Sequence, residues 1–403
     1  MISLSDDLNS IFRGINSAAQ LSKRGGGVGI NLSNLRGEED PIKGYKGMSS
    51  GVIPVMKIFE DTFSYANQLG ARQGSGVVYL HANHIDILDF MDTKKENADE
   101  KRRIKSLSLG IIMPDIVFEL AKNNEDMYMF SPYDVSKELD TPFAKVDITK
   151  HYRDLVNNPN VRKDKISARR FIAKIAELQM ESGYPYLLFI DNANRQNYID
   201  GHIEMSNLCV EILQVQQAPV YNDDQSIADI GKDIICNLGS LNVDKALNSP
   251  DFEKTIDTAM RSLTWVSDNV DVSSVPSIQE GNNQMNAVGL GAMNLHGAFV
   301  AHGMEYGSEE SIEFTRLFFE MVNYYSIKSS MKQAIEKGAR FAGFEKSGYA
   351  DGSYFEKFIE HAAVPTVGEK NRQVFDGRRI TKEQWEELKD EVATHGLYNA
   401  YRL

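Results

Sequence analysis

Cysteine is nearly absent, because the 403-residue sequence contains only Cys209 and Cys236. Two thiols cannot build a disulfide framework, which excludes the class of small, disulfide-stapled secreted domains. The sequence also lacks a cationic-then-apolar leader and any apolar run of about 20 residues, the length that crosses a membrane. We therefore predict a cytoplasmic protein without membrane contact, in which both thiols stay reduced unless chemistry uses them.

Basic residues are also in short supply, with 44 Lys and Arg against 57 Asp and Glu and a formal net charge of -13. A general nucleic-acid binder or a protein of anionic membrane surfaces would present a basic surface, so both classes are excluded. Hydrophobic residues at 42% and charged residues at 25% are typical of a globular protein with a large core. A local basic site for one phosphate-bearing ligand remains compatible with this charge.

The spacing of metal ligands is missing as well. Cys236 follows Cys209 by 27 residues, which is too far for a short zinc or redox motif, and no further thiol accompanies either one. The stretch HANHIDILD offers four ligand-type side chains, His81, His84, Asp86 and Asp89. We favour a solvated loop that leads into a helix over a metal site there, because the helical pattern around the histidines is weak. No resident metal is expected.

What the sequence does have is a hydrophobic period that switches between 3.6 and two. Helical spacing marks residues 8–19, 55–69 and 166–183, with Ser5 or Asp6 as the first N-cap and glycines 25, 70 and 183 as the ends. Strand patterns lie between them in MISL, GVGINL, VVYL, SLSLGIIMP and YPYLLFID. This order predicts βα units around one sheet or barrel.

The sequence after Cys236 predicts mostly helices. Their boundary signals are Pro250 as a first helical residue, Ser308 and Gly338 around a long helix, and a capping box of Thr381 with Gln384 in a helix that ends near Gly396. The last residues, GLYNAYRL, have the pattern of a strand. We find no repeat, low-complexity tract or linker, and so predict no internal domain boundary.

The segment SNLCVEI, residues 206–212, surrounds one of the two thiols with polar side chains. In a strand, Asn207, Cys209 and Glu211 would point to one face and the apolar residues to the other. That face would hold an amide, a thiol and a carboxylate. A half-buried strand with a chance cysteine is the alternative, since a free cysteine often serves as a small buried hydrophobe.

Two glycine-rich segments, KRGGGVG and GARQGSG, have the composition of phosphate-binding loops. Neither matches a P-loop or the glycine pattern of a dinucleotide-binding unit, so each alone indicates a turn. Together with Arg36 and Lys43 they could form an anion site, because arginine offers a planar fork of donors and lysine a point charge.

Several segments in order resemble the large, catalytic subunit of class Ib ribonucleotide reductase. They are KRGGGVGINLSNLRG, SSGVIPVMKIFEDTFSYANQLGARQGSGVVYL, DTKKENADEKRRIKSLSLG, FSPYDV, ESGYPYLLF, SNLCVEI, CNLGSLN and GLGAMNLHG. The resemblance extends from about Ser3 to Leu403, and the separation of SNLCVEI from CNLGSLN is its most specific part. It implies the first part of a ten-stranded α/β barrel of the ribonucleotide reductase and glycyl-radical type, with added helices.

The resemblance also implies roles for four residues in reducing ribonucleoside diphosphates. Cys209 matches the loop cysteine whose thiyl radical takes the 3′ hydrogen of the ribose, so the strand interpretation of SNLCVEI gives way to a loop. Glu211 matches the base for the 3′-hydroxyl proton, and Asn207 an amide that binds the sugar hydroxyls. Cys236 resembles one half of the dithiol that supplies two electrons. We expect Cys209 to lie in a closed pocket completed by several polypeptides.

A regulatory site is implied too, since family members bind a deoxynucleoside triphosphate or ATP at their dimer interface. Asp6, Arg36 and Lys43 match positions that hold the ribose and phosphates of this effector. Arg72 and Gln73, in GARQGSG, match the loop that links effector to substrate base. The first two helices would pack against their copies in a second subunit; covering the barrel alone is the alternative.

The same resemblance implies partners and divides the chain. Residues 1–80 would bind effector and form the dimer, 81–245 would form a half-barrel with the active-site cysteines, and 246–403 a mainly helical continuation. The second electron-donating thiol would precede Met1, while the phosphate loop, a tyrosine pair and C-terminal thiols would follow Leu403, so we expect complementary N- and C-terminal segments. No cofactor would be bound permanently. A small subunit would supply a dimetal-tyrosyl radical, and a glutaredoxin-like or thioredoxin-like protein would supply electrons. The alternative is a nucleotide-binding regulatory or vestigial fragment that catalyses nothing.

Overall fold

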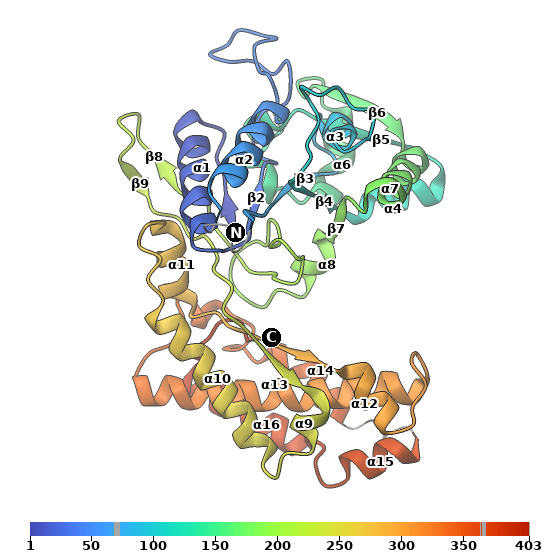
Figure 1. The fold of residues 1–403 in the computed structure, drawn as a ribbon, viewed down its shortest axis with the longest axis vertical. Coiled ribbons are helices and arrows are strands. Elements are labelled where there is room, and N and C mark those ends of the chain that lie inside the picture. Colours follow the sequence, from blue (N-terminus) through green and yellow to red (C-terminus); the bar gives the residue numbers. More distant parts are fainter. Residues whose placement is uncertain (68–72, 363, 365–367, 403) are drawn as a thin grey trace. The chain divides into compact units, whose positions relative to one another are not determined.

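The computed structural model describes residues 1–67, 73–362, 364 and 368–402. The chain forms two compact units, whose elements are labelled in Figure 1. Unit 1 comprises residues 1–197, 201–234 and 272–280, and unit 2 comprises residues 198–200, 235–271 and 281–403. Each unit has a parallel sheet of its own, and helix α11 (Pro276–Met285) contributes residues to both.

Unit 1 is built on a five-stranded parallel sheet. The strand order is β1 (Ile2–Ser3), β2 (Val28–Asn31), β3 (Gly76–His81), β4 (Ser108–Met113) and β7 (Tyr186–Phe189). Each strand is hydrogen-bonded in parallel to the next in this order, and within unit 1 the sheet does not close into a barrel. The five strand predictions for this part of the sequence are confirmed.

Helices connect these strands, as parallel pairing requires. They are α1 (Leu8–Lys23), α2 (Ile53–Tyr65), α3 (Ile87–Asp92), α4 (Asp115–Asn123), α5 (Pro132–Leu139), α6 (Ile148–Asn157), α7 (Ala168–Ser182) and α8 (Ile190–Arg195). A 3₁₀ turn spans Phe143–Lys145. Two antiparallel pairs lie outside the main sheet, β5 (Asp126–Phe130) with β6 (Lys163–Ser167), and β8 (Val220–Tyr221) with β9 (Ile227–Asp229).

The sheet of unit 1 has one apolar and one polar face. Ile2, Ile30, Val78 and Leu109 occupy one row across four strands and belong to the main hydrophobic core with residues of α1, α2, α4 and α7. The neighbouring row points to the opposite face and reads Ser3, Asn31, Tyr79, Gly110 and Tyr186. Helices therefore cover the apolar face, and the polar row faces away from them.

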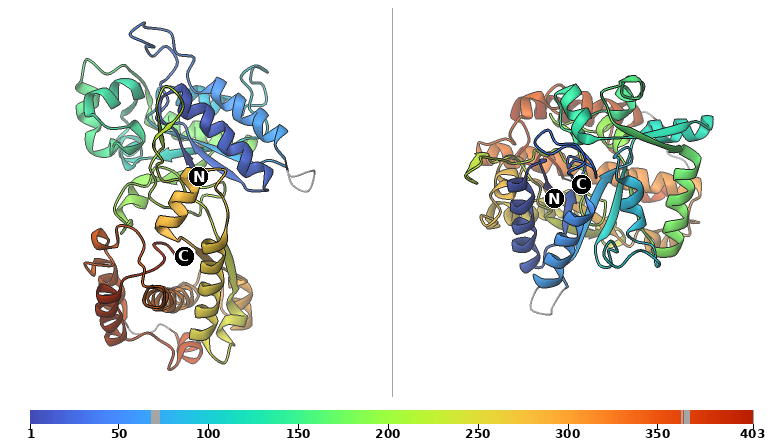
Figure 2. Two further views of the ribbon diagram at one scale, coloured as in Figure 1. Left: turned by 90° about the vertical axis from the view of Figure 1, so that its left-hand side faces the viewer. Right: turned by 90° about the horizontal axis from the view of Figure 1, so that it is seen from above.

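Helices α1 and α2 lie side by side in unit 1 (Figures 1 and 2). Asp7 caps α1 by accepting a 2.7 Å hydrogen bond from the Ser10 backbone N–H, so the predicted caps Ser5 and Asp6 are one or two residues too early. Helix α2 spans Ile53–Tyr65. Its predicted end at residues 69 and 70 lies outside the described residues.

Unit 2 is mostly helical, as predicted. Its strands β10 (Leu238–Asn242) and β11 (Gly289–Met293) pair in parallel. Its helices are α9 (Val243–Leu247), α10 (Phe252–Asn269), α12 (Leu295–Ala301), α13 (Glu309–Lys337), α14 (Ser353–Ala362), α15 (Glu369–Phe375) and α16 (Lys382–His395), with a 3₁₀ turn at Phe344–Lys346. Helix α13, seen nearly end-on in the left view of Figure 2, is the central element and contacts α10, α15 and α16.

Boundary signals in unit 2 agree closely with the structure. Ser308 and Gly338 cap α13 at its two ends, and Thr381 forms the expected capping box with Gln384 at the start of α16. Asp251 rather than Pro250 caps α10, so that helix begins two residues later than predicted. The predicted strand at the end of the sequence is wrong, because residues 396–402 form no strand. Their backbone makes isolated hydrogen bonds, including those donated by Tyr398 and Ala400 and those accepted by residues 397, 401 and 402.

Candidate functional site

The segment around Cys209 is a turn. Residues 208 and 209 have turn geometry, and the strand interpretation of SNLCVEI is therefore wrong while the loop implied by the resemblance is confirmed. Val210 has a φ of 67°, a left-handed conformation that strains a β-branched residue. This kink breaks the regular alternation on which the strand interpretation relied. The Cys209 side chain is exposed in this chain, as is that of Glu211.

Asn207 builds this turn with its own side chain. Its Oδ1 accepts hydrogen bonds from the backbone N–H groups of Glu211 and Ile212, both at 3.1 Å, and from the Ser206 hydroxyl at 3.3 Å. The acceptor side of the amide is thereby occupied. Its Nδ2 has no hydrogen-bond partner among the described residues, so that group remains able to donate to a ligand.

Two glycines allow the turn to lie directly on the sheet. A Cβ added to Gly29 of β2 would lie 2.8 Å from the Ser206 carbonyl oxygen and 3.3 Å from Asn207 Cα. A Cβ on Gly27 would lie 2.6 Å from Leu208. These distances are shorter than normal contacts, so only glycine permits this approach. By sequence alone, both glycines are only part of KRGGGVG, a segment that could contribute to an anion-binding site.

Tyr79 anchors the turn from the polar row of the sheet. The side chain is fully buried, and its hydroxyl donates a 2.7 Å hydrogen bond to the Asn207 backbone carbonyl. Burial raises the pKa of Tyr79, and the nearby Glu211 carboxylate raises it further. The pKa of Cys209 is also raised, first by partial burial and then by Glu211. Cys209 therefore favours the neutral thiol, the form that can carry a hydrogen atom.

The buried carboxyl group of Glu204, just before the turn, contacts Ser3 at the other end of the polar row of the sheet. The Glu204 side chain is 1% exposed, accepts a 3.1 Å hydrogen bond from the Ser3 hydroxyl and lies 3.6 Å from Lys145 Nζ. Its backbone carbonyl accepts a 3.2 Å hydrogen bond from Asn31 Nδ2. Burial raises the pKa of Glu204 to about 7. Sequence reasoning missed Glu204 and Tyr79. Strand register brings Tyr79 under the turn, and contacts with distant residues on β1 and β2 bury Glu204 just before it.

Cys236 belongs to unit 2, where it lies two residues before β10 and is partly exposed. Cys209 belongs to unit 1, and neither cysteine forms a disulfide bond. Their meeting in one active site stays a prediction.

The predicted effector residues Asp6, Arg36 and Lys43 line one pocket of about 620 Å³. The pocket also contains Leu8 and Val55, near the first turns of α1 and α2. Helix N-termini carry partial positive charge and free N–H groups, so two of them beside Arg36 and Lys43 favour an anionic ligand. The structure brings together three residues that the sequence spreads over 38 positions, from 6 to 43.

Within this pocket the two cations differ. Arg36 is held in place by Asp6, which accepts from its Nε at 2.8 Å and from its backbone N–H at 3.1 Å, and by the Pro41 carbonyl. Burial raises the pKa of Asp6, although Arg36 opposes this. Lys43 is exposed and has no ion-pair partner among the described residues. Lys43 is therefore the cation free to bind a phosphate.

The other predicted effector residues are not part of this pocket. Gln73 is exposed just before β3, near the end of α2, where Gly74 approaches the Phe63 carbonyl. Asp6 lies at the opposite end of the α1–α2 pair, which at 1.5 Å per residue is about 24 Å long. Arg72 lies outside the described residues.

The interpretation of HANHIDILD as a solvated loop is wrong. His81 and His84 are buried, and so is Asp86. His84 Nδ1 accepts the Asp86 N–H at 3.0 Å, so its Nε2 donates to the Leu35 carbonyl at 2.8 Å. The Asp86 carboxylate accepts the N–H groups of Glu38 and Val52. These polar side chains thus fix the loop that carries the effector residues.

No group of three or more His, Cys, Asp or Glu side chains among the described residues is arranged to hold a metal ion. No helix among them is both long enough and apolar enough to cross a membrane.

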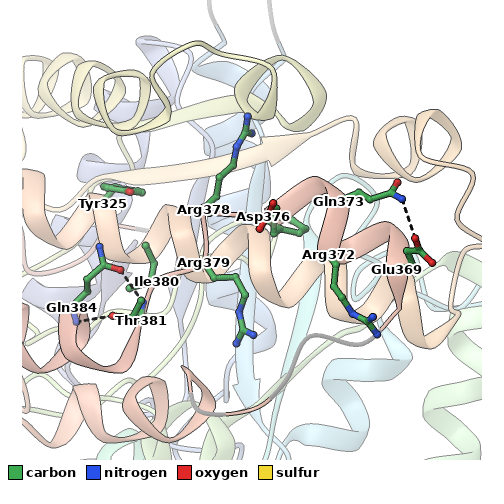
Figure 3. Close-up of a pocket in the computed structure, with 12 residues that line it drawn as sticks. Tyr325, Glu369, Arg372, Gln373, Asp376, Arg378, Arg379, Ile380, Thr381 and Gln384 are labelled. Atoms are coloured by element: carbon green, nitrogen blue, oxygen red, sulfur yellow. Dashed lines mark hydrogen bonds between the residues drawn. The ribbon is translucent and has the colours of Figure 1, made fainter.

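A large pocket of unit 2 lies between α15 and the start of α16 and has a volume of about 1280 Å³. Its arginines, Arg372, Arg378 and Arg379, do not converge on one point. Figure 3 shows Arg378 and Arg379 pointing to opposite sides of the chain. Arg378 also donates to the Leu247 carbonyl. We therefore assign no ligand to this pocket.

A parallel sheet with helices on one face and a thiol-bearing turn on the other places unit 1 in the α/β class of proteins. The sequence matches the family "Ribonucleotide reductase, barrel domain" over residues 1–403. The chain therefore belongs to the ribonucleotide reductase barrel-domain family, and the predicted fold class is confirmed.

Three relatives illustrate this. The "Ribonucleoside-diphosphate reductase subunit alpha" of Mycoplasma pneumoniae is 47% identical over 409 residues, which are 100% of this chain and 57% of the relative. The subunit of the same name from Bacillus subtilis is 44% identical, covering 100% and 58%. The "Ribonucleoside-diphosphate reductase nrdEB subunit alpha" of Bacillus phage SPbeta is 47% identical over 212 residues, which are 52% of this chain and 20% of that relative. The resemblance to a class Ib large subunit is confirmed, and the chain spans little more than half the length of the first two relatives.

Proposed function

We propose that this chain is the substrate- and effector-binding part of a class Ib ribonucleotide reductase large subunit. The reaction is the reduction of ribonucleoside diphosphates to deoxyribonucleoside diphosphates by a thiyl-radical mechanism. The observation that carries this proposal is the turn in which Asn207 positions Cys209 and Glu211 above the polar face of the sheet. A neutral thiol beside an exposed carboxylate suits hydrogen-atom transfer coupled to proton transfer.

Each residue of the turn has one task in the first step. The Cys209 sulfur, as a radical, takes the hydrogen atom from the ribose 3′ carbon, so an S–H bond forms and the radical moves to the sugar. The Glu211 carboxylate accepts the 3′-hydroxyl proton, and Asn207 Nδ2 donates a hydrogen bond to a sugar hydroxyl. Asn207 Oδ1 meanwhile holds the turn, which keeps Cys209 and Glu211 at a fixed separation.

Reduction then needs two electrons, for which Cys236 is one half of a dithiol. The second thiol comes from a complementary segment of the large subunit, and the pair becomes a disulfide as the 2′-hydroxyl leaves as water. A glutaredoxin-like or thioredoxin-like protein re-reduces it. A small subunit supplies the initial radical from its dimetal-tyrosyl centre. Complementary segments would also close the pocket around Cys209, which this chain leaves exposed.

The pocket of Asp6, Arg36 and Lys43 binds the deoxynucleoside triphosphate or ATP effector. Lys43 and the N-termini of α1 and α2 bind the phosphates, while Arg36, fixed by Asp6, borders the ribose. Arg72 and Gln73 relay effector identity to the substrate, and α1 and α2 pair with their copies in a second subunit. The exposed apolar side chains of Leu8 and Phe12 on α1 support this self-dimer.

The decisive experiment is reconstitution. The chain is mixed with the complementary large-subunit segments, the small subunit and a dithiol reductant, and deoxyribonucleoside diphosphate formation is measured. Cys209→Ser should abolish product, because a hydroxyl does not yield its hydrogen atom as readily as a thiol. Unchanged circular dichroism and unchanged triphosphate binding would show that the variant is folded. Equal turnover by Cys209→Ser would exclude the mechanism.

A second candidate function is that of a nucleotide-binding regulatory fragment without catalysis. The observation favouring it is that Asp6, Arg36 and Lys43 meet in one pocket inside unit 1. Equilibrium dialysis of the chain alone with a deoxynucleoside triphosphate would detect this activity. Binding in dialysis without Cys209-dependent product in the reconstituted mixture would favour this second function over the first.

A further inference from the structure

A second polar cavity in unit 1, of about 410 Å³, opens at the carboxyl ends of β3 and β7. It shares no lining residue with the Asp6–Lys43 pocket or with the turn of Cys209. Its chemically active side chains are His81, Lys145, Lys150, Asp191, Arg195 and His202. The proposed reductase chemistry assigns no role to it.

The first indication of a ligand is a largely buried histidine that lines the cavity and has one ring nitrogen without a partner among the described residues. His81 is 4% exposed, and its Nδ1 accepts the Asn83 backbone N–H at 3.1 Å. Nδ1 is therefore unprotonated, and Nε2 must carry the ring hydrogen. Burial lowers the pKa of His81 to about 3, so the ring stays neutral. Nε2 has no acceptor among the described residues. It is not one of the side-chain atoms sealed inside the protein without a partner, so a ligand in the cavity that His81 lines can accept its hydrogen bond.

The second indication is the N-terminus of α6, a helix of 10 residues whose first two residues, Ile148 and Thr149, line the cavity. The Asp147 carboxylate accepts the Lys150 N–H at 2.9 Å. The N–H groups of Ile148 and Thr149 have no acceptor among the described residues. Such groups, together with the positive end of the helix dipole, favour an anion.

The charges of the cavity lead to the same ligand class. Asp191 accepts from the Asp115 N–H and the Thr149 hydroxyl, and Arg195 is paired with Asp115 at 2.7 Å. Lys150 is exposed and has no ion pair among the described residues. Lys145 is ion-paired at 3.6 Å with the buried Glu204 carboxylate, and the Asp147 carboxylate also lines the cavity. Lys150 is thus the lysine available to neutralise a ligand.

We propose that this cavity binds a small phosphate-bearing anion. Its phosphate oxygens accept hydrogen bonds from His81 Nε2 and from the free N–H groups at the start of α6, and Lys150 neutralises part of its charge. A phosphate fits better than a carboxylate, because donors approach from a histidine, a helix end and a lysine, and a tetrahedral group presents acceptors in all these directions. His202, which lines the same cavity, stands beside the bound group.

The test uses the full chain with pyrophosphate and inorganic phosphate as probes. Calorimetry should give a saturable isotherm with Kd below about 1 mM. The ¹⁵N signal of His81 Nε2 should shift on saturation, because it gains an acceptor. Lys150→Gln should weaken binding about tenfold, since one charge-assisted contact is lost. Lys137→Gln, which changes an exposed lysine on α5, should bind as the wild type does.

A double variant, Arg36→Ala with Lys43→Ala, separates this cavity from the effector pocket and should retain the His81 shift. Loss of all pyrophosphate binding in that variant would overturn the proposal, as would unchanged affinity in Lys150→Gln or a saturated complex without a His81 shift. These experiments measure phosphate binding and not turnover. Failure of this proposal would therefore not contradict the proposed reductase function, which the reconstitution assay tests.

Discussion

Tyr79 and Asn207, 128 positions apart in the chain, are joined by a 2.7 Å hydrogen bond from the tyrosine hydroxyl to the asparagine backbone carbonyl. The tyrosine ring lies against Gly110 of the next strand, where an added Cβ would come within 2.4 Å of it. Gly29 of β2 and Gly110 of β4 thus leave the space in which the turn of Cys209 and the Tyr79 ring can lie. The position of Cys209 follows from the sheet, not from its own segment.

Tyr79→Phe should loosen the turn without changing the fold. The ring remains buried, but the Asn207 carbonyl loses its donor, at a cost of about 1 kcal/mol in the free energy of unfolding. Hydrogen exchange at the Glu211 and Ile212 amides should accelerate, and turnover in the reconstituted mixture should fall about tenfold because the reacting groups are less well placed. Tyr65→Phe, at a side chain that is 91% exposed, is the control. Equal exchange in both variants would contradict this role.

Gly29→Ala should displace the turn from the sheet. The new Cβ would meet the Ser206 carbonyl at 2.8 Å, and backbone cannot give way as a flexible side chain does. We expect a destabilisation of roughly 1–3 kcal/mol and loss of turnover. The matched control is Gly291→Ala on β11, where the nearest atom would be 3.7 Å away. Chemical denaturation of both variants measures the difference; similar unfolding midpoints would argue against close approach at Gly29.

Glu204→Gln should reduce the pH dependence of stability. Burial raises the pKa of Glu204 to about 7, so the folded state holds a proton that the unfolded state releases near its ordinary value of 4.5. Stability from this group is present below pH 4.5 and is lost as the pH rises through about 7. The variant stays neutral, and its Tm should therefore fall less than that of the wild type between about pH 5 and pH 8.

Between about pH 5 and pH 8, the free energy of unfolding of the wild type should fall by on the order of 2 kcal/mol more than that of Glu204→Gln. Burial also raises the pKa of Asp233 to about 6, and the Asp233 charge contributes to the raised pKa of Glu204, so the comparison reports Glu204 together with its interaction with Asp233. Thermal unfolding across this pH range provides the measurement. Parallel Tm curves for the two proteins would show that Glu204 is already ionised in the folded state.

Lys43→Ala should weaken triphosphate binding while leaving stability unchanged, because Lys43 is exposed and unpaired among the described residues. The loss should be about tenfold or more for one phosphate contact. Lys46→Ala changes an exposed lysine of the same loop and serves as the control. Arg36→Ala should weaken binding and also lower the Tm, since Asp6 loses its ion pair. Equal affinities for all these proteins would remove the effector assignment.

Local patterns predicted the helices well. Helix α13 begins after Ser308 and ends before Gly338, and α16 begins with the Thr381 capping box, as the sequence indicated. These signals act within one turn of helix, through hydrogen bonds between near neighbours in the chain. The strands of unit 1 were equally accessible, because a buried parallel strand reads as a short apolar run between glycines.

Two local interpretations failed for one reason. The alternation in SNLCVEI suggested a strand, but Val210 adopts a positive φ that no side-chain pattern encodes. The polar residues of HANHIDILD suggested solvent exposure, but His84 and Asp86 satisfy backbone groups of residues 35, 38 and 52. In both cases side-chain hydrogen bonds to the backbone, from near residues in SNLCVEI and from distant ones in HANHIDILD, replaced regular pairing or water.

The sequence by itself determined the helices and strands, the family and the residue types of the site, because capping, periodicity and motif spacing are written in neighbouring positions. Only the tertiary structure decided that Gly29, Tyr79 and Glu204 lie beneath the turn of Cys209, that Arg36 is tied to Asp6 while Lys43 is free, and that His81 faces a second polar cavity. These relationships depend on strand register and on burial, and both arise when elements far apart in the chain pack together.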